Sequence, residues 1–272
     1  MGYIHGFSDG ETERLIRQAE FLGRWVYRSL DLHSTKRLLE VGCGVGAQTL
    51  QLRKRWPALR VVAIDQSEAQ LAKARTNLKK EIGWGMVELR QAAAEKNGLA
   101  KESFDAAMFC WVLEHLREPE AALRETMRVL KPGGQIILTE VFNRTLHTEP
   151  RCPTVEQLWA AGSELQKELG GHPYLGPRLP ELAHAVGVEI RSFRFIPMLG
   201  DERDPSLRRE LFAYFKELLS SFIPQLKQHG RATDADWLAA QAELDQAADT
   251  PRSLFSLTFA QLVGTTGSSS IG

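Results

Sequence analysis

The chain has 272 residues with 34 Lys and Arg against 34 Asp and Glu, so its formal net charge is zero. Proteins that bind DNA or RNA usually carry a basic surface, and we therefore expect no nucleic-acid partner. Three cysteines without metal-ligand spacing give no indication of a disulfide framework or a bound metal. No stretch approaches the roughly 18 apolar residues of a membrane span and the N-terminus lacks a signal peptide, so a cytoplasmic protein is expected.

In chain order, residues 1–34 are predicted as an N-terminal helical lid, because apolar residues over 8–30 recur on one helix face. Residues 35–200 alternate strands with helices, which predicts an α/β fold with a mostly parallel sheet and helices on both faces. We expect a helical cap insertion over residues 201–250, the final strand of the core over 251–263 and a disordered tail over 264–272.

A glycine-rich loop follows the first strand of this core. Residues 37–41 form a short apolar strand, after which Gly42, Gly44 and Gly46 occupy every second position. Residues without a Cβ adopt unusual φ and ψ, and they bring N–H groups and a helix N-terminus against a ligand. With Asp65 about 20 residues further on, the loop also fits the pattern of nicotinamide-dinucleotide sites, so two ligand classes remain at this point.

Four ordered landmarks separate these classes. They are Glu40 before the glycine loop, residues 61–67 with the acid Asp65, residues 103–116, and residues 128–138 around Lys131-Pro132-Gly133-Gly134. Over roughly residues 35–142 the chain resembles class I S-adenosylmethionine-dependent methyltransferases of the small-molecule type, which include the ubiquinone/menaquinone C-methyltransferases. The resemblance implies a Rossmann-like seven-stranded sheet with an antiparallel last strand. It also implies S-adenosyl-L-methionine as cofactor and methyl transfer to an O, N or C atom of a small, partly apolar acceptor.

The same resemblance suggests which residues hold the cofactor. Ligands of open α/β sheets bind outside the carboxyl ends of the strands, where Asp65 can accept both ribose hydroxyls with Gln66 beside it. The expected cofactor residues are Tyr3, Arg14, Glu40, Gly42, Cys43, Gly44, Asp65, Gln66, Ala93, Ala94, Cys110 and Trp111.

One position departs from the family pattern. After the third strand, related sequences place an aspartate that accepts a hydrogen bond from the adenine amino group, and this chain has Ala93 in that slot. Either backbone N–H groups and stacking hold the adenine, or Gln91 or Glu95 substitutes. Losing one such hydrogen bond costs about 1 kcal/mol.

The N-terminal segment offers a lid. Tyr3 and His5 precede the first helix, where Arg14 could pair bidentately with the methionine carboxylate of the cofactor while Tyr3 closes over it. The alternative is a frayed terminus and a solvated helix face.

The acceptor side is less specific. An aromatic stripe over residues 211–223 is expected to pack on the sheet or on a second subunit, as in a homodimer, or to line an acceptor pocket. Packing and a pocket can occur together, because one helix has several faces. His115 follows the fourth strand and is the candidate catalytic base, although a structural histidine would fit the same position. Further candidates for contacts with the acceptor are Glu140, Asn143, His147 and Tyr174.

Two alternative functions accompany the leading one. A protein of this fold can bind S-adenosylmethionine and do other chemistry, such as cyclisation. A nicotinamide-dependent oxidoreductase is disfavoured by Glu40, by the position of Asp105 and by the turn that contains Lys131.

Overall fold

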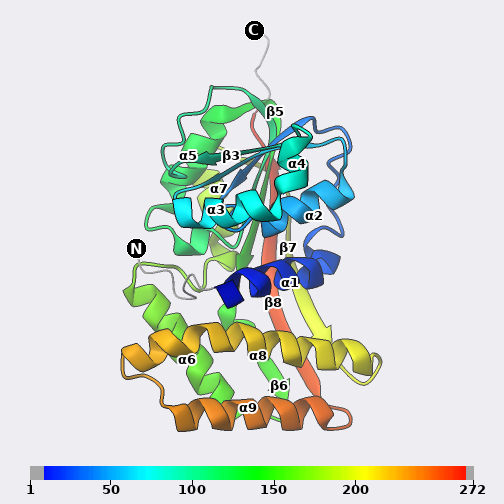
Figure 1. The fold of residues 1–272 in the computed structure, drawn as a ribbon, viewed down its shortest axis with the longest axis vertical. Helices are drawn as coiled ribbons and strands as arrows, with labels where there is room; N and C mark the ends of the chain where they lie inside the picture. The colour runs from blue at the N-terminus through cyan, green and yellow to red at the C-terminus, as the bar shows by residue number, and fades with distance from the viewer. Residues whose placement is uncertain (1–8, 268–272) are drawn as a thin grey trace.

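A central sheet runs through the molecule from an α/β half into a helical half (Figure 1). The computed structural model describes residues 9–267. The strands are β1 (Arg37–Val41), β2 (Arg60–Asp65), β3 (Val87–Gln91), β4 (Phe104–Cys110), β5 (Leu130–Val141), β6 (His147–Glu149), β7 (Glu189–Gly200) and β8 (Leu254–Thr265). The helices are α1 (Asp9–Val26), α2 (Ala47–Arg55), α3 (Glu68–Asn77), α4 (Lys79–Gly83), α5 (Pro119–Val129), α6 (Pro153–Glu168), α7 (Leu179–Ala185), α8 (Pro205–Gln228) and α9 (Asp234–Asp249), with 3-10 turns η1 (Leu113–His115), η2 (Asn143–Thr145) and η3 (Gly176–Arg178).

The sheet has the order β3-β2-β1-β4-β5-β8-β6, and β7 pairs with β8. Strands β1 to β5 pair in parallel, whereas β8 runs antiparallel to β5, β6 and β7. This confirms the predicted mostly parallel α/β sheet. The described residues contain eight strands instead of the predicted seven. The additional strand, β6, resumes the path of β5 along β8, because β5 ends opposite Phe259 and β6 pairs with residues 254–256.

The inner strands are apolar on both faces, as expected for a sheet covered by helices on each side. Two consecutive residues of β1, which point to opposite faces of the sheet, illustrate this. Leu38 belongs to a core that includes Leu52 of α2 and Leu71 of α3, and Leu39 belongs to a core that includes Leu123 of α5. Both leucines have no exposed surface. The helical segment after β2 is divided into α3 and α4 at Leu78.

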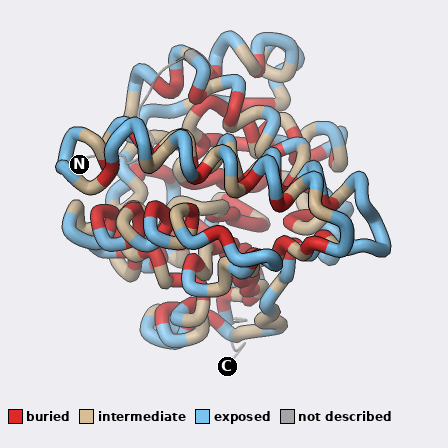
Figure 2. Tube along the Cα trace, turned by 90° about the horizontal axis from the view of Figure 1, so that it is seen from below, coloured by how far each residue is buried: buried red, intermediate tan, exposed pale blue. Residues whose placement is uncertain are grey.

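The helical half consists of α6, α8 and α9 around the far ends of β7 and β8, and we call it the cap. In Figure 1, α8 and α9 cross the lower ends of these two strands, with α6 beside them. Trp159 of α6 contacts the rings of Phe215 and Phe222 of α8, with centroid distances of 5.0 and 5.4 Å. Figure 2 shows buried segments alternating with exposed ones along the outer helices. The aromatic stripe of residues 211–223 therefore packs within its own chain.

The segment boundaries differ from the predicted ones in two places. Helix α6 and strand β6, predicted within the core segment 35–200, pack in the cap. Strand β8 continues to Thr265 because Gly264 and Thr265 pair with β5 and β7, so the predicted tail begins too early. Tyr3, His5 and the last residues of the tail lie outside the described residues. Within residues 9–267, no helix is both long and apolar enough to cross a bilayer.

Helix α1 lies between the two halves (Figure 1). Exposed ion pairs join it to α8 (Arg17 with Glu217, Arg24 with Glu210) and Lys54 of α2 pairs with Glu20. Such pairs contribute little each, about 0–1 kcal/mol. The position of α1 is fixed mainly by buried residues such as Leu22 and Val26.

Candidate functional site

The glycine loop turns back on the end of β2. The N–H groups of Gly42 and Cys43 both donate to the carbonyl of Ile64, at 2.8 and 2.9 Å. Gly42, Gly44 and Gly46 have φ values of +71°, +51° and +79°, in the left-handed region that favours glycine. A Cβ on Gly42 would lie 2.6 Å from Val112 Cγ1, whereas a Cβ on Gly44 would meet nothing within 4 Å. Gly44 therefore forms an open wall on which a ligand can lie.

Asp65 ends β2 beside this loop. Its Oδ2 accepts a hydrogen bond from the Gly44 N–H and its Oδ1 one from the Ser67 N–H, both at 2.8 Å. Burial raises the pKa of the Asp65 carboxyl above its usual value, and the two backbone hydrogen bonds oppose that rise. The carboxylate thus fixes the loop and faces a cavity.

That cavity, which we call the strand-edge cavity, has a volume of about 200 Å³. It lies at the carboxyl ends of β1 to β4, as the sheet topology predicts for a ligand site. Its lining residues are Leu15, Val41, Gly42, Gly44, Ile64, Asp65, Gln66, Ser67, Gln70, Ala92, Ala94, Glu95, Trp111, Val112, His115, Leu116, Gln166, Leu169 and Gly171.

A second cavity of about 160 Å³, the cap cavity, extends from the same loop into the cap. It shares Leu15, Gly42, Gly44, Trp111, His115 and Gln166 with the strand-edge cavity, so the two are neighbouring compartments. Its other lining residues are Arg14, Gln18, Leu22, Cys43, Val45, Ala47, Gln48, Cys110, Glu114, Val141, Phe142, Asn143, Trp159, Met198, Tyr214, Leu218, Phe222, Leu257, Thr258 and Phe259.

Trp111 stands where the compartments meet. Its φ of +56° is unusual for a residue with a large side chain. The conformation is held by its N–H, which donates to the Thr139 carbonyl at 2.8 Å, and by an edge contact with the Phe259 ring at 5.9 Å. Cys110 precedes it and lines the cap cavity, and burial raises the pKa of its thiol.

Two predicted acids lie behind the cavity walls. Glu40 is 4% exposed and accepts a hydrogen bond from Thr49 Oγ1 at 2.6 Å, and burial raises its pKa from 4.5 to about 7. Glu140 has no exposed surface, and its Oε1 accepts the N–H groups of Val112 and Leu113 at 3.0 and 2.7 Å. Neither residue lines a cavity. The carboxyl group of Glu140 holds the segment after β4, and its contact with an acceptor stays a prediction.

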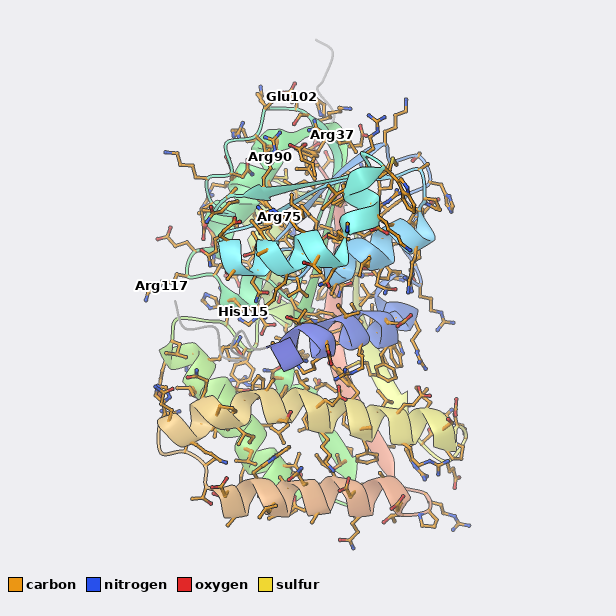
Figure 3. All side chains as sticks on the ribbon, viewed as in Figure 1. Arg37, Arg75, Arg90, Glu102, His115 and Arg117 are labelled. Carbon is orange, nitrogen blue, oxygen red and sulfur yellow. The ribbon has the colours of Figure 1, made fainter. Side chains whose placement is uncertain are left out.

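His115 lies between the α/β half and the cap, near the level of α1 (Figure 3), and lines both compartments. Its side chain is 24% exposed. Nδ1 is 3.5 Å from Gln166 Nε2, and Nε2 is 3.8 Å from Glu114 Oε1. The predicted base is therefore at the junction, beside a buried carboxylate.

Arg14 lines the cap cavity and is 6% exposed. Its Nε and Nη2 donate to the two carboxylate oxygens of Glu11 at 2.7 and 2.6 Å, and Nη1 donates to Gln18. The bidentate geometry that we predicted for the cofactor carboxylate is thus adopted here with Glu11.

The third-strand position differs from the predicted one. Ala93 is exposed and forms an isolated bridge with Lys96, whereas Ala92, Ala94 and Glu95 line the strand-edge cavity. The chain turns at Ala93 and presents the neighbouring residues to the cavity, so the Ala93 contact with the cofactor stays a prediction. Gln66 lines the cavity and its carbonyl accepts from Gln91 Nε2 at 3.1 Å. Gln91 thus binds the backbone.

The three remaining acceptor-side candidates differ in whether they line one of the two cavities. Asn143 is buried and lines the cap cavity, where its Nδ2 is 3.3 Å from Ser163 Oγ. His147 is exposed on β6, opposite Ser256, and Tyr174 stacks under Arg144 with a distance of 4.2 Å to the ring centroid. Neither lines the strand-edge or the cap cavity, so their contacts with an acceptor stay predictions. Strand β6 carries His147 beyond the end of β5 and away from the junction.

Several lining residues escaped sequence reasoning. Glu114 lies beside His115 and could have been found from that position. Trp159, Gln166 and Tyr214 carry no local signal, because they reach the cavity only through the packing of α6 and α8. Over residues 9–267 no cluster of His, Cys, Asp and Glu could hold a metal ion.

Known proteins resemble this chain in sequence and in fold. Residues 39–138 match the sequence profile of a family described as "Methyltransferase domain". The ubiquinone/menaquinone biosynthesis C-methyltransferase UbiE of Syntrophotalea carbinolica is 33% identical over 125 residues, covering 45% of this chain and 52% of that protein. The ubiquinone biosynthesis O-methyltransferase of Pseudomonas fluorescens (strain SBW25) is 35% identical over 131 residues, covering 47% and 51%. The chain spans about half the length of these two curated relatives.

A solved structure extends the likeness to the cap. The crystal structure of the 4+2 cyclase SpnF is 24% identical, with a TM-score of 0.58 over 93% of this chain and 82% of that chain. This similarity concerns the fold alone.

Proposed function

We propose that this chain, which belongs to the class I S-adenosylmethionine-dependent methyltransferases, transfers a methyl group from S-adenosyl-L-methionine to a small, partly apolar molecule. The observation that carries the proposal is the meeting of two compartments at Gly44, Trp111 and His115. In this proposal the strand-edge cavity holds the donor and the cap cavity the acceptor.

The strand-edge residues fit the donor. The open space beside Gly44 admits a ligand against the loop backbone. Within the described residues each Asp65 oxygen accepts one N–H, and a carboxylate oxygen has two lone pairs, so capacity remains for ribose hydroxyls. Ala94 and Leu116 give apolar wall for an adenine ring, with Glu95 as the nearby acid.

The chemistry asks for position more than for reactive side chains. When bound, S-adenosylmethionine supplies a methyl group that its sulfonium already activates. The protein must then align the acceptor and exclude water, which the buried aromatic walls of the cap cavity do. For an acceptor that loses a proton, His115 at the junction is the group that would take it.

Calorimetric titration with S-adenosylhomocysteine tests the proposal. Wild-type protein should bind it and NAD should not bind. Asp65→Ala should weaken binding at least about 100-fold, since hydrogen bonds to a charged acceptor contribute about 1.5–3 kcal/mol each. Asp249→Ala, which removes an exposed carboxylate at the end of α9, is the matched control and should bind like wild type. Unchanged affinity in Asp65→Ala would contradict the donor site, and binding without methylation of any small molecule would contradict the transferase activity.

A further inference from the structure

The cap cavity contains a carboxylate that the proposed reaction does not require. Glu114 is 6% exposed and lines the cap cavity. Its Oε2 accepts a hydrogen bond from Gln166 Nε2 at 2.8 Å, and its Oε1 lies 3.8 Å from His115 Nε2. Burying a carboxylate costs free energy unless an opposite charge or hydrogen bonds compensate for the lost hydration. We therefore expect a positively charged or hydrogen-bonding group of a ligand beside Glu114.

The backbone around Glu114 is fixed from three directions. The Glu114 carbonyl accepts the His172 N–H at 2.6 Å, and the preceding Leu113 N–H donates to Glu140 at 2.7 Å. Gly171 packs so closely that a Cβ there would lie 2.8 Å from the Glu114 carbonyl oxygen and 2.9 Å from Gln166 Cγ. The carboxylate is therefore presented by a rigid segment.

The charges of the cap cavity are unbalanced. Among its described lining residues, Arg14 and Glu114 are the two from the Lys, Arg, Asp and Glu classes. Arg14 is already matched by the two oxygens of Glu11, at 2.6 and 2.7 Å. No Lys or Arg among the described lining residues pairs with Glu114, whose carboxylate is approached by Gln166 Nε2 and His115 Nε2.

The walls around this charge are aromatic. Trp111, Trp159, Tyr214, Phe222 and Phe259 all line the same cavity. Faces of aromatic rings attract cations, and the attraction grows when water is excluded. A carboxylate among such rings suits a positively charged amine on an apolar body better than a neutral or anionic molecule.

We infer that the cap cavity selects an acceptor that carries an ammonium group, and that Glu114 binds this group. The inference rests on the proposed function, because it assigns the acceptor compartment to the molecule that is methylated. It concerns recognition, whichever atom receives the methyl group. In a competing role, Glu114 faces the positive sulfonium of the donor. Removing its charge weakens the binding of the amine in the first role and of S-adenosylmethionine in the second.

The test uses three probes of similar shape with different charge: phenethylamine, phenethyl alcohol and 3-phenylpropionate. Each is titrated at neutral pH into the full chain saturated with S-adenosylhomocysteine. The amine should bind at least tenfold more tightly than the alcohol, and the carboxylate should bind most weakly. Amine affinity no greater than that of the alcohol would overturn the inference.

Glu114→Gln keeps the shape of the side chain and removes its charge. It should lower the affinity for phenethylamine about tenfold and leave the alcohol unchanged. Affinity for S-adenosylhomocysteine should stay within twofold, which also shows that the variant is folded. Glu118→Gln, the same change on an exposed residue four positions away, is the control and should change nothing.

Two outcomes contradict the assignment of Glu114. The amine affinity could survive the Gln substitution, or the substitution could weaken S-adenosylmethionine while sparing S-adenosylhomocysteine and the amine, which would place Glu114 at the sulfonium. Absence of S-adenosylhomocysteine binding in wild type would instead contradict the proposed function. The amine titrations on the unloaded chain would then still decide the role of Glu114.

Discussion

The two compartments of the site are built in different ways. The strand-edge cavity is lined mainly by residues at or just after the ends of strands. They are Gly42 and Gly44 after β1, Asp65, Gln66 and Ser67 at the end of β2, Ala92, Ala94 and Glu95 after β3, and Trp111, Val112, His115 and Leu116 after β4. The cap cavity collects single residues from distant elements, such as Trp159 of α6, Met198 of β7, Tyr214 of α8 and Phe259 of β8.

This difference separates what a local sequence can encode from what packing must supply. In a parallel sheet, the loops that follow the strands all lie at the same edge. The strand-edge cavity, our proposed donor site, therefore depends mainly on the sequences of these loops. The cap cavity exists because α6 and α8 pack together on the long β7–β8 pair. The family match, residues 39–138, ends before any cap helix begins. The cap cavity, our proposed acceptor compartment, therefore lies largely outside the part of the chain that the family match covers.

The largest expected effect comes from the glycine loop. Gly42→Ala should destabilise the protein by about 2–5 kcal/mol, combining about 1–2 for the left-handed φ with about 1–3 for the clash with Val112. Gly44→Ala has the φ cost but open space around its Cβ, and should lose only about 1–2 kcal/mol. Urea denaturation of both variants measures the difference, and equal losses would show that Val112 moves aside freely.

The next effect is a pH dependence that originates under the same loop. Glu40 has a folded pKa of about 7 against an ordinary 4.5, so between these values the folded state binds more protons than the unfolded state. Its contribution to stability is thus highest below pH 4.5 and falls as pH rises to 7, by on the order of 3 kcal/mol.

Glu40→Gln removes this titration and still accepts the hydrogen bond from Thr49. The variant should be more stable than wild type at neutral pH, with the gap closing toward pH 4.5. Denaturation curves over this range measure it. A gap that does not vary with pH would show that Glu40 does not titrate there.

Many residues of the strand-edge cavity could be predicted from the sequence, because the patterns that mark them span only a few neighbouring residues. The glycine loop, Asp65 at the end of β2 and the position of His115 after β4 all follow from alternating strands and helices, and the predicted mostly parallel sheet is confirmed. Ala93 does not line the strand-edge cavity, whereas its two neighbours do. Its slot was assigned by alignment, whereas a bridge to Lys96 turns the chain so that Ala92 and Ala94 face the cavity.

The residues of the cap cavity could not be predicted from short sequence patterns. His147 and Tyr174 both follow strand β5 in the sequence. The chain leaves β5 through the 3-10 turn η2, and β6 then pairs with β8 away from the junction. Glu140 lies near the end of β5, but its side chain accepts two backbone N–H groups inside the protein. Residues such as Trp159 and Gln166 depend on how helices pack, which no short pattern contains.

A substitution deep in the cap should leave the donor site largely unaffected. Leu257 is 6% exposed and lines only the cap cavity, so Leu257→Trp should fill that space and cost about 1–3 kcal/mol of stability by overpacking. Affinity for S-adenosylhomocysteine should change less than threefold, well under 1 kcal/mol. Leu238→Trp on the exposed face of α9 is the control for the added ring, since Leu238 is 65% exposed. A large loss of S-adenosylhomocysteine affinity in Leu257→Trp alone would show that the compartments are not separable.

The smallest effect tests the end of the donor compartment. Glu95 lines the strand-edge cavity and Ala93 does not, so we propose Glu95 as the residue that accepts the adenine amino group. Glu95→Ala should weaken S-adenosylhomocysteine binding about fivefold, the equivalent of one hydrogen bond of about 1 kcal/mol. Ala93→Asp should leave the affinity unchanged, because the new carboxylate would point to solvent at an exposed position. Calorimetry on the two variants, measured side by side, separates these positions. If Ala93→Asp instead tightened binding, the loop after β3 would rearrange around the bound cofactor and the family slot would be the correct one after all.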